Sequence, residues 1–273
     1  MINQTYKFNT KSEGPSANVI AEGTGLSKSL VKKLMTFGAV WINKKGKTTR
    51  LRSHKKVLTA DTKIEVYHDE KILTSAPPSV PEILFEGDQF DVWYKPQGWL
   101  SQGTQFGDKY SLLRVAEVKR NKSFLIHRLD REVAGIMVVA ATSKVANYFS
   151  ERWNKKSTRK FYQAEVMGKL ESLDTLVLES DIDEKESRTV VSPVRYGEDS
   201  TFLEIEIKTG RKHQIRIHLD EAGHPVLGDP AYGTGNKNSE GMKLVATRLI
   251  LPDPKTRHDT MEFTLPEELH LFS

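Results

Sequence analysis

The sequence predicts an α+β protein in two parts: a small basic module, followed by a larger part in which strands outnumber helices. Apolar and alternating runs, typical of strands, recur throughout the second part. A segment at 75–81 separates the parts, because three prolines in five positions favour an extended spacer. Charge divides near the same place. The first 60 residues hold 12 Lys and Arg against two acids, a balance of +10, whereas the rest carries −5.

The composition is that of a globular chain and excludes several chemistries. Of the 273 residues 37% are hydrophobic, which is enough for a sizeable core, and none is cysteine. Disulfides, thiolate zinc sites and thiol nucleophiles are therefore excluded. The first ten residues lack the pattern of a signal peptide, and no apolar run approaches the roughly 18 residues of a membrane helix. We therefore expect a cytoplasmic protein with no membrane partner.

In the first part, residues 1–14 are polar and are expected to form a flexible tail, and the module is expected to span 15–70. Ser27 is the predicted N-cap of a helix whose apolar residues recur at helical spacing up to a stop at Gly38. Strands are predicted at 40–42 and 64–67, with a turn at 43–46.

The second part is expected to begin after a linker at 71–81 and to fill 82–273, a length that can hold one core. Its predicted strands lie at 90–94, 135–140, 161–166 and 202–207. Helices are predicted at 144–153 and 213–222, the second ending before Gly223.

The densest group of charged residues, at 126–131, immediately precedes the apolar strand at 135–140. Asp130 lies there between Arg128 and Arg131, and such neighbours favour an ionised carboxylate. An ionised carboxylate is suited to act as a nucleophile or to stabilise positive charge. A surface ion pair at a strand edge would explain the same residues without any chemistry.

A second group runs from Lys208 to Leu219 and continues through 223–233. It contains three histidines, but His213 and His218 are five residues apart and no nearby acid completes a set of metal ligands. A phosphate loop is disfavoured too, because the longer glycine-rich pattern is missing. A metal-dependent hydrolase is therefore the weakest of the functions considered.

Together these groups resemble the RluA family of pseudouridine synthases. The block at 127–131, followed by Gly135 and an apolar strand, is similar to the family's catalytic motif. Four further blocks match in the expected order: Lys95-Pro96-Gln97-Gly98, 160–164, 209–219 and 223–233. The resemblance covers about 82–273 and implies a catalytic domain with a mixed, largely antiparallel sheet and flanking helices.

The resemblance also implies roles for individual residues. Asp130 would be the catalytic carboxylate, Tyr162 would pack on the target base, and Arg216 would pair with Asp130 and keep it ionised. Arg128, Leu244, Arg131 and His127 would form the substrate-binding set, with Leu244 as an apolar wall and Arg128 filling the gap left by the base. Converting uridine to pseudouridine is neither redox chemistry nor hydrolysis, so no cofactor, no metal and no nucleotide cofactor is expected.

This chain departs from the family pattern at three places. Val133-Ala134 replaces the usual Thr-Ser, Val245 replaces a histidine, and Tyr94 stands where an asparagine often precedes Lys-Pro. These departures affect the expected substrate more than the expected chemistry.

Residues 20–67 are similar to the S-four type of RNA-binding module. The basic residues expected to contact RNA are Lys28, Lys32, Lys33, Lys44 and Lys45. We expect an RNA partner, with ribosomal RNA ahead of transfer RNA, and a monomer. The alternative from another class is a non-catalytic RNA-binding protein that retains the synthase fold.

Overall fold

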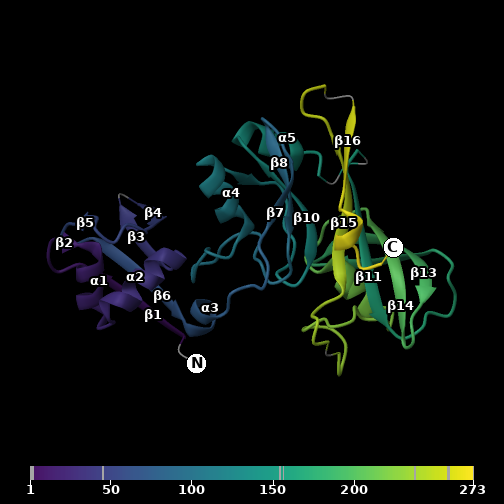
Figure 1. Ribbon diagram of the computed structural model, residues 1–273, viewed down its shortest axis with the longest axis horizontal. Helices are drawn as coiled ribbons and strands as arrows, with labels where there is room; N and C mark the ends of the chain where they lie inside the picture. The colour runs from purple at the N-terminus through teal and green to yellow at the C-terminus, as the bar shows by residue number, and fades with distance from the viewer. Residues whose placement is uncertain are drawn as a thin grey trace. The chain divides into compact units, whose positions relative to one another are not determined.

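The computed structural model describes residues 3–44, 46–153, 155, 157–236, 238–256 and 259–272. The chain forms two compact units (Figure 1). The first comprises Met1–Pro78 and Gln102–Val115, and the second comprises Ser79–Ser101 and Ala116–Ser273. In the described part of the chain no helix is both long and apolar enough to cross a bilayer.

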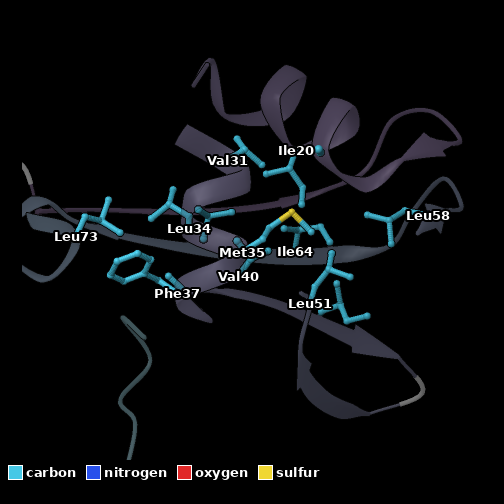
Figure 2. Close-up of a cluster of buried hydrophobic side chains, with 14 residues drawn as sticks. Ile20, Val31, Leu34, Met35, Phe37, Val40, Leu51, Leu58, Ile64 and Leu73 are labelled. Atoms are coloured by element: carbon cyan, nitrogen blue, oxygen red, sulfur yellow. The ribbon is translucent and has the colours of Figure 1, made fainter. Parts of the chain in front are cut away.

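A four-stranded antiparallel sheet and two main helices build the first unit. The sheet order is β1 (Asn3–Asn9), β6 (Lys63–Asp69), β3 (Val40–Lys44), β4 (Lys47–Arg50). The other elements are β2 (Gly14–Pro15), β5 (Val57–Leu58), α1 (Ser16–Thr24), α2 (Lys28–Phe37) and α3 (Glu70–Thr74). Figure 2 shows Ile20 and Val31 from the helices and Ile64 from the sheet directed into one apolar cluster.

Helix α2 begins and ends where the sequence predicted. The Ser27 hydroxyl accepts a hydrogen bond from the Leu30 amide at 3.3 Å. Gly38 closes the helix with φ +78°, a conformation that glycine adopts without steric cost. Strands β3 and β6 contain the predicted strands at 40–42 and 64–67.

The expectation of a flexible tail at 1–14 is wrong. Residues 3–9 form β1, which pairs along its whole length with β6. Tyr6 and Phe8 are two residues apart, so they share one face of the strand and pack against the apolar cluster of the unit. Tyr6 and Phe8 are the only apolar alternation among polar neighbours, so the sequence pattern is too short to predict a strand here.

The segment at 71–81 is only partly a spacer. Its first four residues belong to α3, where Asp69 accepts the Ile72 amide as N-cap and Leu73 is buried. The first proline follows only at 77, so nothing in the sequence prevents this helical turn.

Residues 102–115 fold with the first unit, which the sequence did not predict. Asp108 forms ion pairs with Arg50, at 3.1 Å, and with Arg52. Tyr110 packs edge-on against Phe37, with ring centroids 5.7 Å apart. A side chain at Gly107 would lie 2.9 Å from the Phe37 carbonyl oxygen, so this close approach requires glycine.

The second unit is built on a ten-stranded sheet that is antiparallel except where β10 meets β15. Its main path runs β12-β13-β14-β11-β15-β10-β8-β7, with β16 beside β15 and β9 beside β10. The strands are β7 (Glu82–Glu86), β8 (Phe90–Lys95), β9 (Phe124–Leu125), β10 (Ala134–Ala140), β11 (Arg159–Met167), β12 (Leu176–Ile182), β13 (Lys185–Tyr196), β14 (Ser200–Ile207), β15 (Leu244–Pro252) and β16 (Thr260–Thr264).

The helices of this unit are few and short: α4 (Leu112–Arg120), which starts at the unit boundary, α5 (Ser143–Ser150), α6 (Gln214–Glu221) and the 3₁₀ turn η1 (Glu267–Leu269). Helix α5 packs Phe149 against the apolar residues of β8 and β10. The predicted mixed, largely antiparallel α+β architecture is confirmed.

Strands β10 and β15 approach each other unusually closely at Gly135. A Cβ atom there would lie 2.4 Å from the Ala246 carbonyl oxygen, and the φ of +128° is unfavourable for any other residue. Tyr162 on β11 pairs with the same Ala246 from the other side. The close approach therefore brings the segment that ends at Gly135 near Tyr162.

Candidate active site

Asp130 lies in the loop between β9 and β10, and its side chain is 28% exposed. The Ser101 hydroxyl fixes the preceding residue by donating to the Leu129 carbonyl at 2.6 Å and accepting the Leu129 amide at 2.9 Å. The Gly98 amide donates to the Arg131 carbonyl at 2.8 Å on the other side. The Lys-Pro-x-Gly turn thus holds the backbone on both sides of Asp130.

Lys95 supports that turn from within. Its ammonium is fully buried and donates to the carbonyls of Trp99, at 2.8 Å, and Pro96, at 3.1 Å. Burial lowers the pKa of Lys95 to about 7, although the charges of Glu132 and Asp130 act in the opposite direction. Lys95 therefore organises backbone carbonyls rather than presenting a charge to solvent.

Arg216 joins Asp130 to a second carboxylate. Its Nη1 donates to Asp130 Oδ2 at 2.9 Å, while Nε and Nη2 bind the two oxygens of Asp229 at 2.6 and 2.7 Å. Burial opposes the charge of Arg216, but the hydrogen bonds to Asp229 and Asp130 raise its pKa above the ordinary value. The bidentate hydrogen bonds to Asp229 fix the plane of the guanidinium and hence the direction of its hydrogen bond to Asp130.

The helix that carries Arg216 is anchored by polar side chains. Gln214 donates to Thr189 and to the Arg188 carbonyl on β13, each at 3.0 Å. His218 is buried and lies 2.8 Å from the Ser187 hydroxyl on the same strand. These contacts set the rotation of α6 that directs Arg216 toward Asp130.

His213 is a second neighbour of Asp130. Its Nε2 lies 3.5 Å from Asp130 Oδ2, and its Nδ1 lies 3.1 Å from the Tyr232 hydroxyl. Burial lowers the pKa of His213, and the charge of Asp130 only partly offsets this effect. The ring is therefore neutral at neutral pH.

Tyr162 lies on β11, where Asp130 influences its ionisation. Burial, and to a smaller extent the charge of Asp130, raises the pKa of Tyr162 far above its ordinary value, so the phenol stays protonated. Leu244 pairs with Ala164, two residues beyond Tyr162, so Leu244 and Tyr162 lie on the same face of the sheet.

The sequence profile described as RNA pseudouridylate synthase matches residues 89–221. An uncharacterised RNA pseudouridine synthase of Aquifex aeolicus is 30% identical over 233 residues, 76% of this chain and 72% of that protein. The chain belongs to the RNA pseudouridine synthase family. The predicted enzyme class is thereby confirmed, and so is the RluA-like resemblance at the level of the family.

Other relatives cover more of the synthase. An uncharacterised RNA pseudouridine synthase of Mycoplasma genitalium is 29% identical over 92% of this chain and 88% of its own length. The ribosomal large subunit pseudouridine synthase C of Vibrio parahaemolyticus is 27% identical over 90% and 86%. The structure of human RNA pseudouridylate synthase domain containing 1 superposes with a TM-score of 0.57 at 21% identity, covering 70% of this chain and 86% of that one, and shares the fold.

The structure brings Asp130, Arg216 and Tyr162 of the synthase together, but it distributes the other predicted residues differently. Arg128 is exposed, and Arg131 donates to the Gly98 carbonyl at 3.3 Å. His127 accepts the Val138 amide at 3.1 Å and stacks on Trp153 at 4.1 Å. The Nε2 atom of His127 and one face of its ring are thus engaged by protein, so the ring supports β10.

Sequence reasoning missed two participants. Asp229, in the block 223–233, received no individual role, yet its carboxylate orients Arg216 and also accepts the Ala231 amide at 2.8 Å. His213 was considered only as a metal ligand, and within the described ranges no three His, Asp or Glu side chains form a metal-binding group. The available signal in the sequence was that Asp and His residues recur near Arg216. The contact itself could not be predicted, because Asp229 reaches Arg216 on α6 only through the fold.

In the first unit, the predicted RNA contacts fall on α2 and the β3–β4 turn. Lys28, Lys32 and Lys33 are exposed on α2. Lys44 ends β3, and Lys45 lies outside the described residues.

Proposed function

We propose that this synthase isomerises a uridine of ribosomal RNA, with Asp130 as the catalytic carboxylate. The observation that carries the proposal is the contact between Asp130 and Arg216, which is itself clamped by the buried Asp229. An arginine whose Nη1 donates to Asp130 Oδ2 at 2.9 Å fixes the position of the carboxylate. The carboxylate is still partly exposed, as contact with a substrate requires.

The proposed reaction moves one bond without changing the composition of the RNA. The bond between uracil N1 and ribose C1′ breaks, the base turns, and C5 bonds to C1′. The proton lost from C5 is balanced by one gained at N1. Asp130 acts on the sugar either as a nucleophile or by stabilising charge and transferring a proton.

Tyr162 and Leu244 are proposed to form the base pocket, because they share one face of the sheet near Asp130. Extruding a base from its stack costs a few kcal/mol. Stacking on an aromatic ring returns about 1–3 kcal/mol. Arg128, exposed on the same loop as Asp130, is proposed to fill the space that the base leaves, since guanidinium groups stack on bases.

The preference for ribosomal RNA rests on the relatives. Those named ribosomal large subunit pseudouridine synthase C span nearly the whole chain, as in Vibrio parahaemolyticus and Haemophilus influenzae. Their extensive coverage includes the basic first unit as well as the catalytic domain.

That first unit is proposed to be an S-four-like RNA-binding module. Lys28 and Lys32 are one helical turn apart on the exposed face of α2, and Lys33 adjoins them. Lys28 also lies at the positive end of the helix, and α2 has no acid in its first turn. Both arrangements cost helix stability, so they fit a role in contacting phosphate better than a structural one.

The substrate is tested by incubating the purified synthase with unmodified ribosomal RNA or with transfer RNA and mapping the pseudouridines formed. We expect modification of ribosomal RNA at discrete positions, with equal yield in a chelator. Exclusive modification of transfer RNA would overturn the substrate assignment, and loss of activity in chelator would overturn the metal-independent reaction.

A further inference from the structure

Two protein groups approach the same oxygen of Asp130. Arg216 Nη1 lies 2.9 Å and His213 Nε2 lies 3.5 Å from Oδ2. Among the described residues, none donates a hydrogen bond to the other oxygen, Oδ1. The carboxylate is thus held asymmetrically, by one oxygen.

The backbone of His213 is unusual in a way that concerns this contact. His213 has φ +55° and ψ +19°, in the left-handed region that few residues other than glycine adopt, with asparagine, aspartate and histidine the commonest exceptions. It occupies the N-cap position of α6, but its side chain makes no capping hydrogen bond. The His213 carbonyl accepts the Ile217 amide at 2.9 Å, so the backbone starts α6 while the imidazole is left to contact Asp130 and Tyr232. Residues held in sparsely populated backbone regions cluster at functional sites.

The second ring nitrogen of His213 identifies the tautomer. Tyr232 is the hydroxyl partner of Nδ1 at 3.1 Å, and the two rings meet edge-on with centroids 5.9 Å apart. If the Tyr232 hydroxyl donates to Nδ1, the proton of the neutral imidazole resides on Nε2, the nitrogen that lies 3.5 Å from Asp130 Oδ2. Burial lowers the pKa of His213, which is consistent with a neutral ring.

We propose that His213, oriented by Tyr232, is a positioning residue that acts with Arg216 to occupy Oδ2 of Asp130, so that Oδ1 is the oxygen presented to the ribose. This inference rests on the proposed catalytic role of Asp130. Arg216 alone leaves the carboxylate free to rotate about its bond to Cβ, and a second donor at the same oxygen restricts that rotation. The expected consequence of losing His213 is a slower chemical step with nearly unchanged RNA binding.

The main test compares variants at position 213 that respect the backbone. His213→Asn accepts the left-handed conformation but is too short to reach Asp130. We expect kcat for pseudouridine formation to fall about 10- to 100-fold, as for a misplaced reactive group, with KM nearly unchanged. His224→Asn is the matched control, since the Met167 carbonyl is the one described hydrogen-bond partner of the His224 ring, and this variant should retain full kcat.

Chemical rescue separates positioning from a structural defect. His213→Gly removes both the ring and the backbone strain. Added imidazole should raise the kcat of this variant several-fold, because it can reoccupy the space between Asp130 and Tyr232. Imidazole should not restore Asp130→Asn. Tyr232→Phe, which removes one hydroxyl and keeps the ring, serves as a second variant if those at 213 fold poorly. It should lower kcat without changing KM.

Two outcomes overturn the inference: full kcat in both His213→Asn and Tyr232→Phe, or a defect confined to KM. If Asp130→Asn is inactive while those variants are fully active, only the positioning role fails. If Asp130→Asn is active, the proposed function itself fails.

Discussion

The site depends on a chain of three charged residues rather than on a single pair. Arg216 is almost completely buried and connects the partly exposed Asp130 with the fully buried Asp229. Asp229 compensates the cost of burying the guanidinium and fixes its direction. Asp130 can then remain accessible without having to stabilise Arg216 alone.

Replacing Arg216 should therefore lower the free energy of unfolding as well as inactivate the protein. Arg216→Met leaves Asp229 buried without its partner, and we expect the free energy of unfolding to fall by about 3–5 kcal/mol. Arg248→Met, which breaks an exposed pair with Glu262, is the control and should cost no more than about 1 kcal/mol. Urea titration measures both, and equal effects would contradict the importance assigned to Asp229.

His127 should make stability sensitive to mild acid. Burial, assisted by the charge of Lys160, lowers the pKa of His127 to about 3. In the unfolded chain the histidine pKa is about 6.5, so between about pH 6.5 and 3 the unfolded chain binds a proton that the folded chain does not. The neutral, folded His127 therefore costs no stability above about pH 6.5. As the pH falls from about 6.5 toward 3, the free energy of unfolding decreases progressively.

The comparison with His127→Gln isolates this effect from other titrating groups. We expect the free energy of unfolding of the variant to change less between pH 6.5 and 5 than that of the native protein. An identical slope in His127→Gln and the native protein would show that the imidazole is not buried as described.

Among the elements, those with local signals were predicted and those with purely tertiary support were not. Helix α2 has an N-cap serine and a closing glycine, and β10 is a continuous apolar run. By contrast, β12 and β13 alternate between exposed and covered residues without a strong apolar pattern, and β1 offers only Tyr6 and Phe8. These strands form because a neighbour supplies their hydrogen bonds.

The same distinction applies to the site. The resemblance placed Asp130, Arg216 and Tyr162, and the structure adds the contact of Arg216 with Asp130 at 2.9 Å. No pattern in the sequence brings Asp229 or Tyr232 to α6, because both follow a turn beyond the helix and return through the fold. For His127, which the resemblance assigns to the substrate-binding set, the structure adds the stacking of its ring on Trp153.

The junction of β10 and β15 yields a prediction at Gly135. In Gly135→Ala the new methyl group would meet backbone atoms of Ala246 at 2.4–2.7 Å, which cannot move without separating the strands. Gly223→Ala also has a positive φ, +82° against +128° at Gly135, but open space around the added carbon, so it measures the strain of a left-handed backbone alone, about 1–2 kcal/mol. We expect Gly135→Ala to lower the unfolding midpoint clearly further and to abolish activity, and equal midpoints would contradict the close approach.

Across the whole chain, the modest net charge of +5 conceals a basic first part and an acidic remainder. Under the proposed function, the basic first part supplies affinity for RNA and the remainder carries out the chemistry. Binding through lysine and phosphate is salt-sensitive and largely independent of sequence. The selection of a particular uridine then depends on the base pocket and on the shape of the RNA around it.

Reversing the charge of α2 should weaken RNA binding and change its salt dependence. We expect the Lys28→Glu, Lys32→Glu, Lys33→Glu variant to bind ribosomal RNA less tightly, with a flatter plot of log affinity against log salt by about 0.7–0.9 per lost phosphate contact. At saturating RNA its kcat should be native. The control makes the same charge change at the exposed Lys144, Lys169 and Lys255, and an unaltered salt slope in the α2 variant would refute the role of α2.

The most direct measurement is the rate of pseudouridine formation by Asp130→Asn in ribosomal RNA. Asparagine keeps the size of the side chain and can accept from Arg216, but it supplies no carboxylate. The account predicts no detectable pseudouridine from folded Asp130→Asn that still binds RNA, alongside native activity of the exposed control Asp181→Asn. Pseudouridine formation by Asp130→Asn at a rate near that of the native synthase would contradict it.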